Sequence, residues 1–222
     1  MLFAADSLFA RLRAAVRPDW HAYVGHAFVE RLGAGTLPQD CFRRYLVQDY
    51  LFLIHFARAY ALAAYKSRDL ADIRQAADGL HTIADTEMRL HVAFCAEWGL
   101  SEADMAAEPE AMETMAYTRY VLEAGNAGDV LDLHVALAPC IVGYAEIGSM
   151  LASKGRIEGN HYHAWIEMYA SDDYQAAARR QVKHMDRLMA RRSGEGRFEA
   201  LAATFGEATR LETAFWDMGL RG

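Results

Sequence analysis

Cysteine is scarce in this chain of 222 residues. The three cysteines, Cys41, Cys95 and Cys140, are odd in number and form no CxxC pair. Their pattern argues against a disulfide scaffold or a structural zinc site, and it favours a reducing compartment. The N-terminal segment has no basic start, and Asp6 breaks its apolar run, so it does not resemble a signal peptide. We therefore expect a cytoplasmic protein.

An excess of basic charge is also missing. The chain carries 23 Lys and Arg against 30 Asp and Glu, a formal net charge of -7, so we expect no nucleic-acid partner. No run approaches the roughly 18 uninterrupted apolar residues of a membrane span, so we expect no membrane partner. The sequence contains no P-loop, no GxGxxG before a helix, no GxSxG elbow and no HExxH.

Helical periodicity is present nearly from end to end. Hydrophobic residues make up 53% of the chain, and no segment alternates strictly as a half-buried strand would. The pattern predicts one all-α domain over residues 1–222, with no internal repeat and no linker. Helices 38–67, 69–99 and 129–154 are expected to be central, and the amphipathic, basic helix 172–192 to lie outside. The remaining expected elements are helices 7–16 (closed by Pro18), 19–32, 109–125, 162–169 and 196–218, a turn at 101–104, and an interruption of 129–154 at Pro139.

Cys140 follows Pro139 inside an apolar helix. Proline removes one helical N–H and disturbs the preceding turn, so a cysteine beside it can face a cavity with free backbone groups. Tyr144 lies four residues further on and shares the helix face with Cys140. Together they predict a pocket wall with a thiol and a phenol. The alternative is a small buried hydrophobe beside a packed tyrosine, the commoner role of a free cysteine.

Two carboxylates stand beside aromatic residues. Asp49 shares a face of helix 38–67 with Phe52, where a charge is costly unless it is paired or bound to a ligand. The alternative is a buried aspartate satisfied by an arginine or a tyrosine hydroxyl. Glu212 shares a face with Phe215 and Trp216 and is a candidate proton donor. An exposed glutamate on an amphipathic helix is the commoner outcome at such a position.

A metal site is a competing hypothesis. Glu87 and His91 are four residues apart on helix 69–99, but a ferritin-like di-iron site needs a Glu-x-x-His from each of two helices. The only Glu-x-x-His runs from Glu158 to His161, across a Gly-Asn pair. We therefore expect no metal, and we interpret Glu87 and His91 as a local structural pair.

Six segments occur in a recognisable order: LPQDCFRRYLVQDYLFLIHFA, TEMRLHVAF, MAYTRY, LAPCIVGYAEIG, YHAWIEMYAS and LETAFWDM. In this order and spacing, from about His26 to Met218, the chain resembles the TenA (thiaminase II) family of aminopyrimidine hydrolases. The resemblance implies a heme-oxygenase-like all-α bundle, without heme or another cofactor, that usually forms a homotetramer. It also implies a small-molecule pyrimidine substrate.

The implied activity is hydrolysis at the exocyclic methylene of 4-amino-5-aminomethyl-2-methylpyrimidine, which gives the hydroxymethylpyrimidine and ammonia in thiamine salvage. The same chemistry would cleave thiamine. By resemblance, Cys140 in PC-x-x-x-Y matches the family's nucleophile, and Glu212 in E-x-x-FWDM matches its acid/base. Asp49 in QD-x-x-x-x-x-H matches the carboxylate that binds the pyrimidine.

The resemblance further implies a pocket lined by tyrosines, at Tyr117, Tyr144 and Tyr169. Members often carry tyrosine where this chain has Phe52, which keeps a ring for stacking and loses one hydroxyl. Two other functions stay open: a non-catalytic, regulatory protein that binds a pyrimidine, and a metal-dependent oxidase on the same bundle. The first predicts stabilisation by ligand without product, and the second predicts about one metal per chain.

Overall fold

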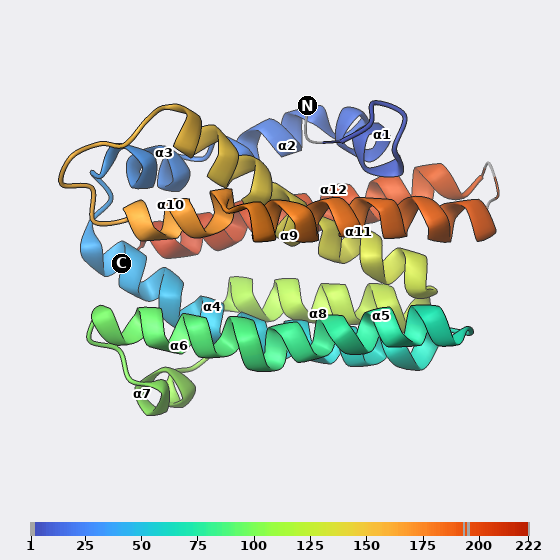
Figure 1. The fold of residues 1–222 in the computed structure, drawn as a ribbon, viewed down its shortest axis with the longest axis horizontal. Helices are drawn as coiled ribbons and strands as arrows, with labels where there is room; N and C mark the ends of the chain where they lie inside the picture. Colours follow the sequence, from blue (N-terminus) through green and yellow to red (C-terminus); the bar gives the residue numbers. More distant parts are fainter. Residues whose placement is uncertain (1–2, 193, 195, 222) are drawn as a thin grey trace. The chain divides into compact units, whose positions relative to one another are not determined.

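The computed structural model describes residues 3–192, 194 and 196–221, and all regular structure in these residues is helical (Figure 1). The N-terminal helices are α1 (Leu8–Ala15), α2 (Arg17–Val24) and α3 (Ala27–Ala34). They are followed by α4 (Gln39–Lys66), α5 (Leu70–His81), the π-helix η1 (Thr82–Glu87), α6 (Met88–Glu97), α7 (Glu102–Ala107) and α8 (Met112–Ala127). The last helices are α9 (Val130–Ser153), α10 (His163–Ala170), α11 (Asp172–Arg191) and α12 (Arg197–Leu220).

The chain packs as two compact units, each built from two stretches of sequence. Unit 1 comprises Met1–Leu37 and His134–Trp216, and unit 2 comprises Pro38–Leu133 and Asp217–Gly222. Helices α9 and α12 each continue from one unit into the other. The single domain over residues 1–222 stays a prediction.

Unit 2 is organised by the long helix α4. Helices α5, α8 and α6 run alongside it (Figure 1), and α7 also packs on it. One face of α4 buries Tyr45, Asp49, Phe52 and Phe56, which follow one another three or four residues apart. The central position expected for helix 38–67 is therefore confirmed within this unit.

Unit 1 has an aromatic core. Trp20 of α2 stacks on Phe205 of α12 with ring centroids 5.5 Å apart, and Phe9 of α1 meets Trp20 edge-on at 5.4 Å. Phe28 of α3 stacks on Trp216 at 4.9 Å. Aromatic pairs of this kind contribute about 0.5–1.5 kcal/mol each beyond the area that they bury. They therefore fix the three short N-terminal helices on α12.

Two expected boundaries near the N-terminus are wrong. Pro18 does not close the first helix but lies in the first turn of α2, where proline costs no hydrogen bond. The expected helix 19–32 is two helices, because the chain leaves helical geometry between Gly25 and His26. The ring of His26 then accepts a hydrogen bond from the N–H of Phe28 and caps α3.

The structure of the middle of the chain differs from the sequence prediction in three further ways. Helix α8 begins at Met112, after Pro109 rather than at it. Helix α9 continues through Pro139, so the expected interruption is wrong. The stretch expected as helix 69–99 contains the π-helix η1, and few of its side chains are buried, while Ile73 and Leu90 are exposed. It is therefore not central, because its apolar residues do not converge on one buried face.

The remaining helices fall close to their expected ranges. Asp69 caps α5 and Ser101 caps α7, each by accepting a backbone N–H. Arg179, Lys183 and Arg187 are exposed along α11, as predicted for a basic outer face. Helix α9 is long and apolar enough to cross a membrane, but 72% of its most apolar window is buried within the structure. Burial in a protein core accounts for that apolar character.

We predict that Gly148→Ala lowers the stability of unit 1. A Cβ at Gly148 would lie 2.6 Å from the backbone carbon of Tyr169 and 2.8 Å from the nitrogen of Ala170. Helix propensity would favour alanine by about 1 kcal/mol, but overpacking against rigid backbone costs about 1–3 kcal/mol. Urea unfolding should therefore show a net loss. Gly196→Ala is the control, since nothing lies within 4 Å of its added Cβ; equal unfolding midpoints for the two variants would contradict the packing.

Candidate active site

The residues predicted to act on a pyrimidine are distributed over both units. Unit 2 holds Asp49 and Phe52 on α4 and Tyr117 on α8. Unit 1 holds Cys140, Tyr144, Tyr169 and Glu212. Each unit thus holds its own group of predicted site residues.

The carboxyl group of Asp49 is buried in unit 2, with 7% of the residue exposed. The hydroxyl of Tyr45, one turn earlier on α4, donates to Oδ2 of Asp49 at 3.4 Å. Nδ1 of His91 on α6 lies 3.5 Å from the same oxygen, while its Nε2 lies 3.0 Å from the carbonyl oxygen of Leu46. The tyrosine hydroxyl considered from the sequence as a partner of Asp49 is therefore present, and a histidine joins it.

Burial governs the protonation of this cluster. It raises the pKa of Asp49, against the opposing influence of His91 and the hydrogen bond from Tyr45. It also raises the pKa of Glu87, and the nearby Asp49 adds to that shift. The same two causes raise the pKa of Cys95 to about 12, so its thiol stays protonated at neutral pH. The surroundings of this cluster therefore make all three groups harder to ionise than they are in water.

An aromatic wall adjoins Asp49 in unit 2. Phe52 lies one turn after Asp49, and its ring centroid is 5.1 Å from that of Tyr117. Phe56 continues the row, with its ring stacked 5.4 Å from Phe52. The structure therefore brings Phe52 and Tyr117 together, as the sequence predicts for two members of one pocket.

A second aromatic group lies in unit 1. The ring of Tyr144 on α9 is 4.9 Å from that of Tyr169 on α10, and Trp165 contacts both rings. Trp216 lies 5.3 Å from Tyr144. The structure thus brings together the two tyrosines that the sequence assigns to the pocket from this unit.

Gln175 of α11 holds this aromatic group in place. Its buried side-chain amide donates to the carbonyl oxygens of Ala145 (2.9 Å) and Tyr169 (2.8 Å). The first carbonyl belongs to the residue that follows Tyr144 on α9, and the second belongs to Tyr169 itself on α10. A single side chain therefore ties the helices that carry Tyr144 and Tyr169.

Cys140 and Glu212 depart from their commoner structural roles. Cys140 is half-buried, whereas Cys41 and Cys95 are buried. Glu212 is 1% exposed, so the alternative of a solvent-exposed glutamate is wrong. A buried carboxyl and a partly accessible thiol are the states in which these groups can do chemistry on a bound molecule.

Two residues beside Asp49 were missed or misread from the sequence. His91 bonds to α4 and not to Glu87, so the predicted local pair of Glu87 and His91 is wrong. Gln48, which precedes Asp49 in the sequence, is also buried. Its hydrogen-bond partners lie at the start of α8. The only sequence signal for Gln48 was an amide in an apolar run. Among the described residues, no three His, Cys, Asp or Glu side chains gather as a metal site would require.

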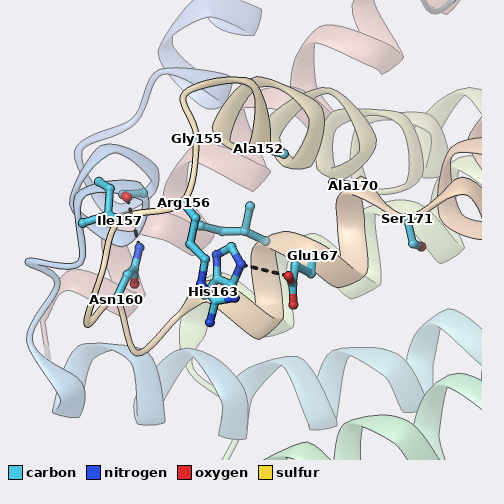
Figure 2. Close-up of a pocket in the computed structure, with 11 residues that line it drawn as sticks. Ala152, Gly155, Arg156, Ile157, Asn160, His163, Glu167, Ala170 and Ser171 are labelled. Carbon is cyan, nitrogen blue, oxygen red and sulfur yellow. Dashed lines mark hydrogen bonds and ion pairs between the residues drawn. The ribbon is translucent and has the colours of Figure 1, made fainter.

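A separate hollow of about 390 Å³ opens on unit 1 (Figure 2). It lies between the end of α9, the following loop and α10. On its α10 side, His163 and Glu167 lie four residues apart and pair at 2.9 Å. The amide of Asn160 donates to the carbonyls of Leu32 and Gly33. None of the predicted site residues lines this hollow.

Comparison with known proteins gives a consistent result. Residues 13–222 match the model of the TENA/THI-4/PQQC family. An aminopyrimidine aminohydrolase from Halalkalibacterium halodurans is 35% identical over 213 residues, which cover 96% of this chain and 95% of that protein. The resemblance predicted from the six segments is therefore confirmed.

Solved structures agree. A crystal structure described as a TenA family transcription regulator from a Silicibacter species is 45% identical, with a TM-score of 0.92 and 97% of each chain covered. A domain of unknown function with a heme oxygenase-like fold from Shewanella denitrificans has a TM-score of 0.72 and 14% identity, covering 96% and 92% of the two chains. The second likeness shows the fold alone, and the predicted heme-oxygenase-like, all-α class is confirmed.

We predict that Asp49→Asn stabilises the protein at pH 7. Burial raises the folded-state pKa of Asp49, so the folded protein binds this proton more tightly than the unfolded chain does. Stability from this group is therefore present at low pH and is lost as pH rises through the raised pKa. An amide never ionises, and its oxygen can still accept the hydrogen bond from Tyr45.

Thermal unfolding of the variant should show a midpoint about 2–4 °C above wild type at pH 7. The gain should shrink as pH falls toward the ordinary aspartate value of 3.8. Asp78→Asn is the control, because Asp78 is exposed on α5. A gain that does not depend on pH, or a loss at pH 7, would contradict the burial argument.

Proposed function

Because the chain belongs to the TENA/THI-4/PQQC family, we propose that it hydrolyses the exocyclic carbon–nitrogen bond of an aminopyrimidine. The substrate is 4-amino-5-aminomethyl-2-methylpyrimidine, and the products are the hydroxymethylpyrimidine and ammonia. The observation that carries the proposal is the buried carboxyl of Asp49 beside the aromatic pair of Phe52 and Tyr117. The aminopyrimidine aminohydrolase from Halalkalibacterium halodurans, similar over nearly its whole length, supports it.

Asp49 suits the amidine-like edge of a 4-aminopyrimidine. That edge offers an amino N–H and a ring nitrogen side by side, and a carboxyl group can bond both at once. Burial raises the pKa of Asp49, so a protonated carboxyl can donate to the ring nitrogen while its other oxygen accepts from the amino group. Phe52 and Tyr117 would bind the flat ring by stacking.

Cys140 acts as the nucleophile in this proposal. Direct displacement of an amine from the methylene is slow, because the amine is a poor leaving group. Addition of the Cys140 thiolate to the pyrimidine ring breaks its aromaticity, and the ring electrons then expel the amine as the exocyclic C–N bond breaks. Water adds to the exocyclic carbon, the thiolate leaves, and the aromatic ring is restored. One difficult step is thereby divided into easier ones.

Glu212 supplies the proton transfers. The departing amine needs a proton, and the attacking water must lose one, so a single carboxyl group can give a proton to the amine and then take one from the water. Its burial on α12 excludes bulk water from that exchange. We propose Tyr144 and Tyr169 as further residues that bind the substrate.

Thiamine is the second substrate that we propose, since it carries the same pyrimidine and methylene with a thiazolium as leaving group. The physiological setting is thiamine salvage in the cytoplasm. We also propose that the protein assembles as a homotetramer. Several apolar side chains left exposed on the single chain could be covered in such an assembly: Tyr65, Leu70, Leu90 and Met112.

We predict that Cys140→Ala reduces turnover of the aminomethylpyrimidine by at least about 10³-fold while the fold persists. Cys41→Ala is the matched control, because Cys41 is a buried thiol whose Sγ donates to the carbonyl of Leu220. Release of ammonia, with the pyrimidine product separated by chromatography, measures both variants. Near wild-type turnover in Cys140→Ala would contradict the nucleophile. Ligand-induced stabilisation of the wild type without any product would favour the regulatory, binding-only function instead.

We predict that Glu212→Gln lowers kcat by different factors for the two substrates. Loss of a general acid costs about 10²–10⁴-fold when the leaving group needs a proton. The amine of the aminomethylpyrimidine needs this proton. The thiazole of thiamine does not, because it leaves as a neutral molecule. Comparison of kcat for both substrates should therefore show a loss at least about tenfold larger for the aminomethylpyrimidine. Equal losses would show that Glu212 does not protonate the leaving group.

A further inference from the structure

We propose that Gln48 and His55 are positioning residues that fix α8 on α4 and thereby place the Tyr117 ring against the substrate. The inference rests on the proposed function, in which Tyr117 contacts the pyrimidine. Both residues lie on α4, on either side of Asp49 and Phe52 along the helix. They are seven residues apart, about two helical turns, so they project from one face of α4.

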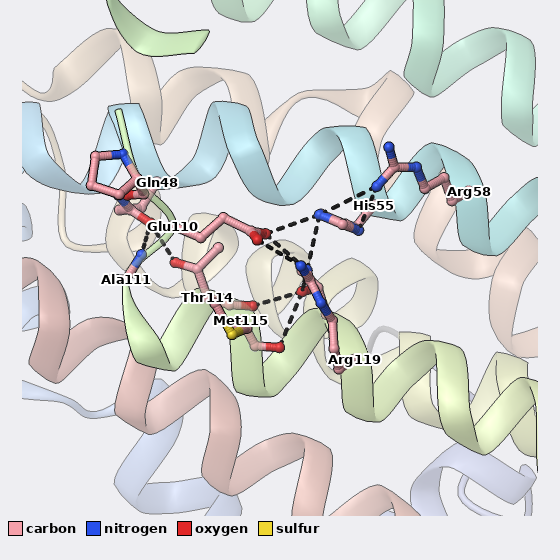
Figure 3. A network of polar contacts seen from close by, with 10 residues as sticks. Gln48, His55, Arg58, Glu110, Ala111, Thr114, Met115 and Arg119 are labelled. Atoms are coloured by element: carbon pink, nitrogen blue, oxygen red, sulfur yellow. Dashed lines mark hydrogen bonds and ion pairs between the residues drawn. The ribbon is translucent and has the colours of Figure 1, made fainter. Parts of the chain in front are cut away.

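Gln48 uses its whole side-chain amide on the start of α8 (Figure 3). Its Nε2 donates to the carbonyl of Pro109 at 3.0 Å. Its Oε1 accepts from the N–H of Ala111 at 2.8 Å and from the hydroxyl of Thr114 at 2.7 Å. Because the amide is buried, loss of any of these bonds would leave a polar group with neither a protein partner nor water to bond to.

The start of α8 needs this support from another helix. Its N-cap residue is Ala111, which has no side chain able to cap, and no local side chain caps the helix. In a capping box, a Glu or Gln at the third helical position accepts the N–H of the N-cap residue. Here Thr114 occupies that position, and Gln48 of α4 accepts both the N–H and the Thr114 hydroxyl. The cap of α8 is thus supplied by α4, which couples the register of the two helices.

His55 makes a second connection, nearer the surface. Its Nε2 lies 2.9 Å from Oε1 of Glu110, just before the N-cap of α8. Arg119, further along α8, binds both oxygens of Glu110 at 2.9 and 2.7 Å. Arg58 approaches Nδ1 of His55 at 3.0 Å. A neutral ring that donates from Nε2 to Glu110 and accepts at Nδ1 from Arg58 satisfies these two contacts. Nη1 of Arg119 also lies 3.0 Å from Nε2 of His55.

The charges around His55 agree with a neutral ring. Burial lowers the pKa of His55, with Glu110 opposing this shift and Arg119 and Arg58 adding to it. The hydrogen bond from Arg119 is the main cause of the lowered pKa of Glu110. Glu110 therefore stays ionised and His55 stays neutral near pH 7. The hydrogen bond between them thus persists near neutral pH.

The two connections act on the aromatic wall. Phe52 lies between Gln48 and His55 on α4, and its ring meets Tyr117, which lies between Thr114 and Arg119 on α8. A slip of α8 by one residue would move Tyr117 by about 1.5 Å. Gln48 and His55 prevent this slip through their bonds to the start of α8.

Gln48→Leu is expected to raise KM for the aminomethylpyrimidine about tenfold while kcat falls less than about threefold, because the ring wall contributes to binding. The decisive measurement is a double-mutant cycle with Tyr117→Ala. Once the ring is gone, Gln48→Leu should change KM less than about twofold. Gln181→Leu is the matched control, since Gln181 is a buried amide in unit 1 that bonds to His134, and its effect should be additive with Tyr117→Ala.

His55→Ala provides a variant at a less buried site that keeps the core intact. It should raise KM about two- to threefold, and His55→Gln should restore it, because its amide N–H can donate to Glu110. Hydrogen exchange at the amides of residues 111–118 gives a readout that needs no activity. Exchange there should quicken in Gln48→Leu and stay unchanged in Gln181→Leu.

Additive effects of Gln48→Leu and Tyr117→Ala, or unchanged exchange at the start of α8, would overturn the inference. A wild-type protein that neither turns over the aminomethylpyrimidine nor binds the hydroxymethylpyrimidine would instead refute the proposed function. The exchange data would still report the coupling of α4 to α8 in that case. The two failures are therefore distinguishable.

Discussion

The buried carboxyl group of Asp49 is the constraint around which the site in unit 2 is built. An ionised carboxylate at this depth would cost several kcal/mol without full compensation. Tyr45 and His91 compensate in part, at 3.4 and 3.5 Å, and burial still raises the pKa of Asp49. A core selected only for stability would carry an apolar residue here. The carboxyl group is thus held in a state that a bound amidine-like edge can satisfy.

Helix α4 links that carboxyl group to the rest of the site. On one face it carries Asp49 and Phe52, and on an adjoining face Gln48 and His55 hold the start of α8. In unit 1, Gln175 has a similar place beside Tyr144 and Tyr169, because it ties α9 and α10. In both units, therefore, polar side chains outside the aromatic group hold together the helices that carry the aromatic rings.

The sequence predicted the long helices well, because their apolar periodicity and caps are local properties. It failed where tertiary contacts decide. The end of α2 depends on the cap that His26 gives to α3, and the exposure of Ile73 and Leu90 depends on which helices pack beside them. Neither can be read from one segment alone.

The site was predicted unevenly for the same reason. Burial of Asp49 and the pairing of Phe52 with Tyr117 follow from helix faces and from the family resemblance. The partner of His91 lies on another helix, so its spacing from Glu87 pointed to the wrong pair. Gln48 showed only an amide in an apolar run, and its role depends on an uncapped helix start more than sixty residues further along the chain.

The central claim is that water replaces the amine on the exocyclic methylene. Ammonia release alone does not prove it, because removal of the 4-amino group from the ring would also release ammonia. We would incubate the wild-type protein and the aminomethylpyrimidine in water enriched in oxygen-18 and locate the label by mass spectrometry. The account predicts one labelled oxygen on the hydroxymethyl arm and an intact 4-amino group. A label on a ring carbonyl, with the aminomethyl arm intact, would contradict it.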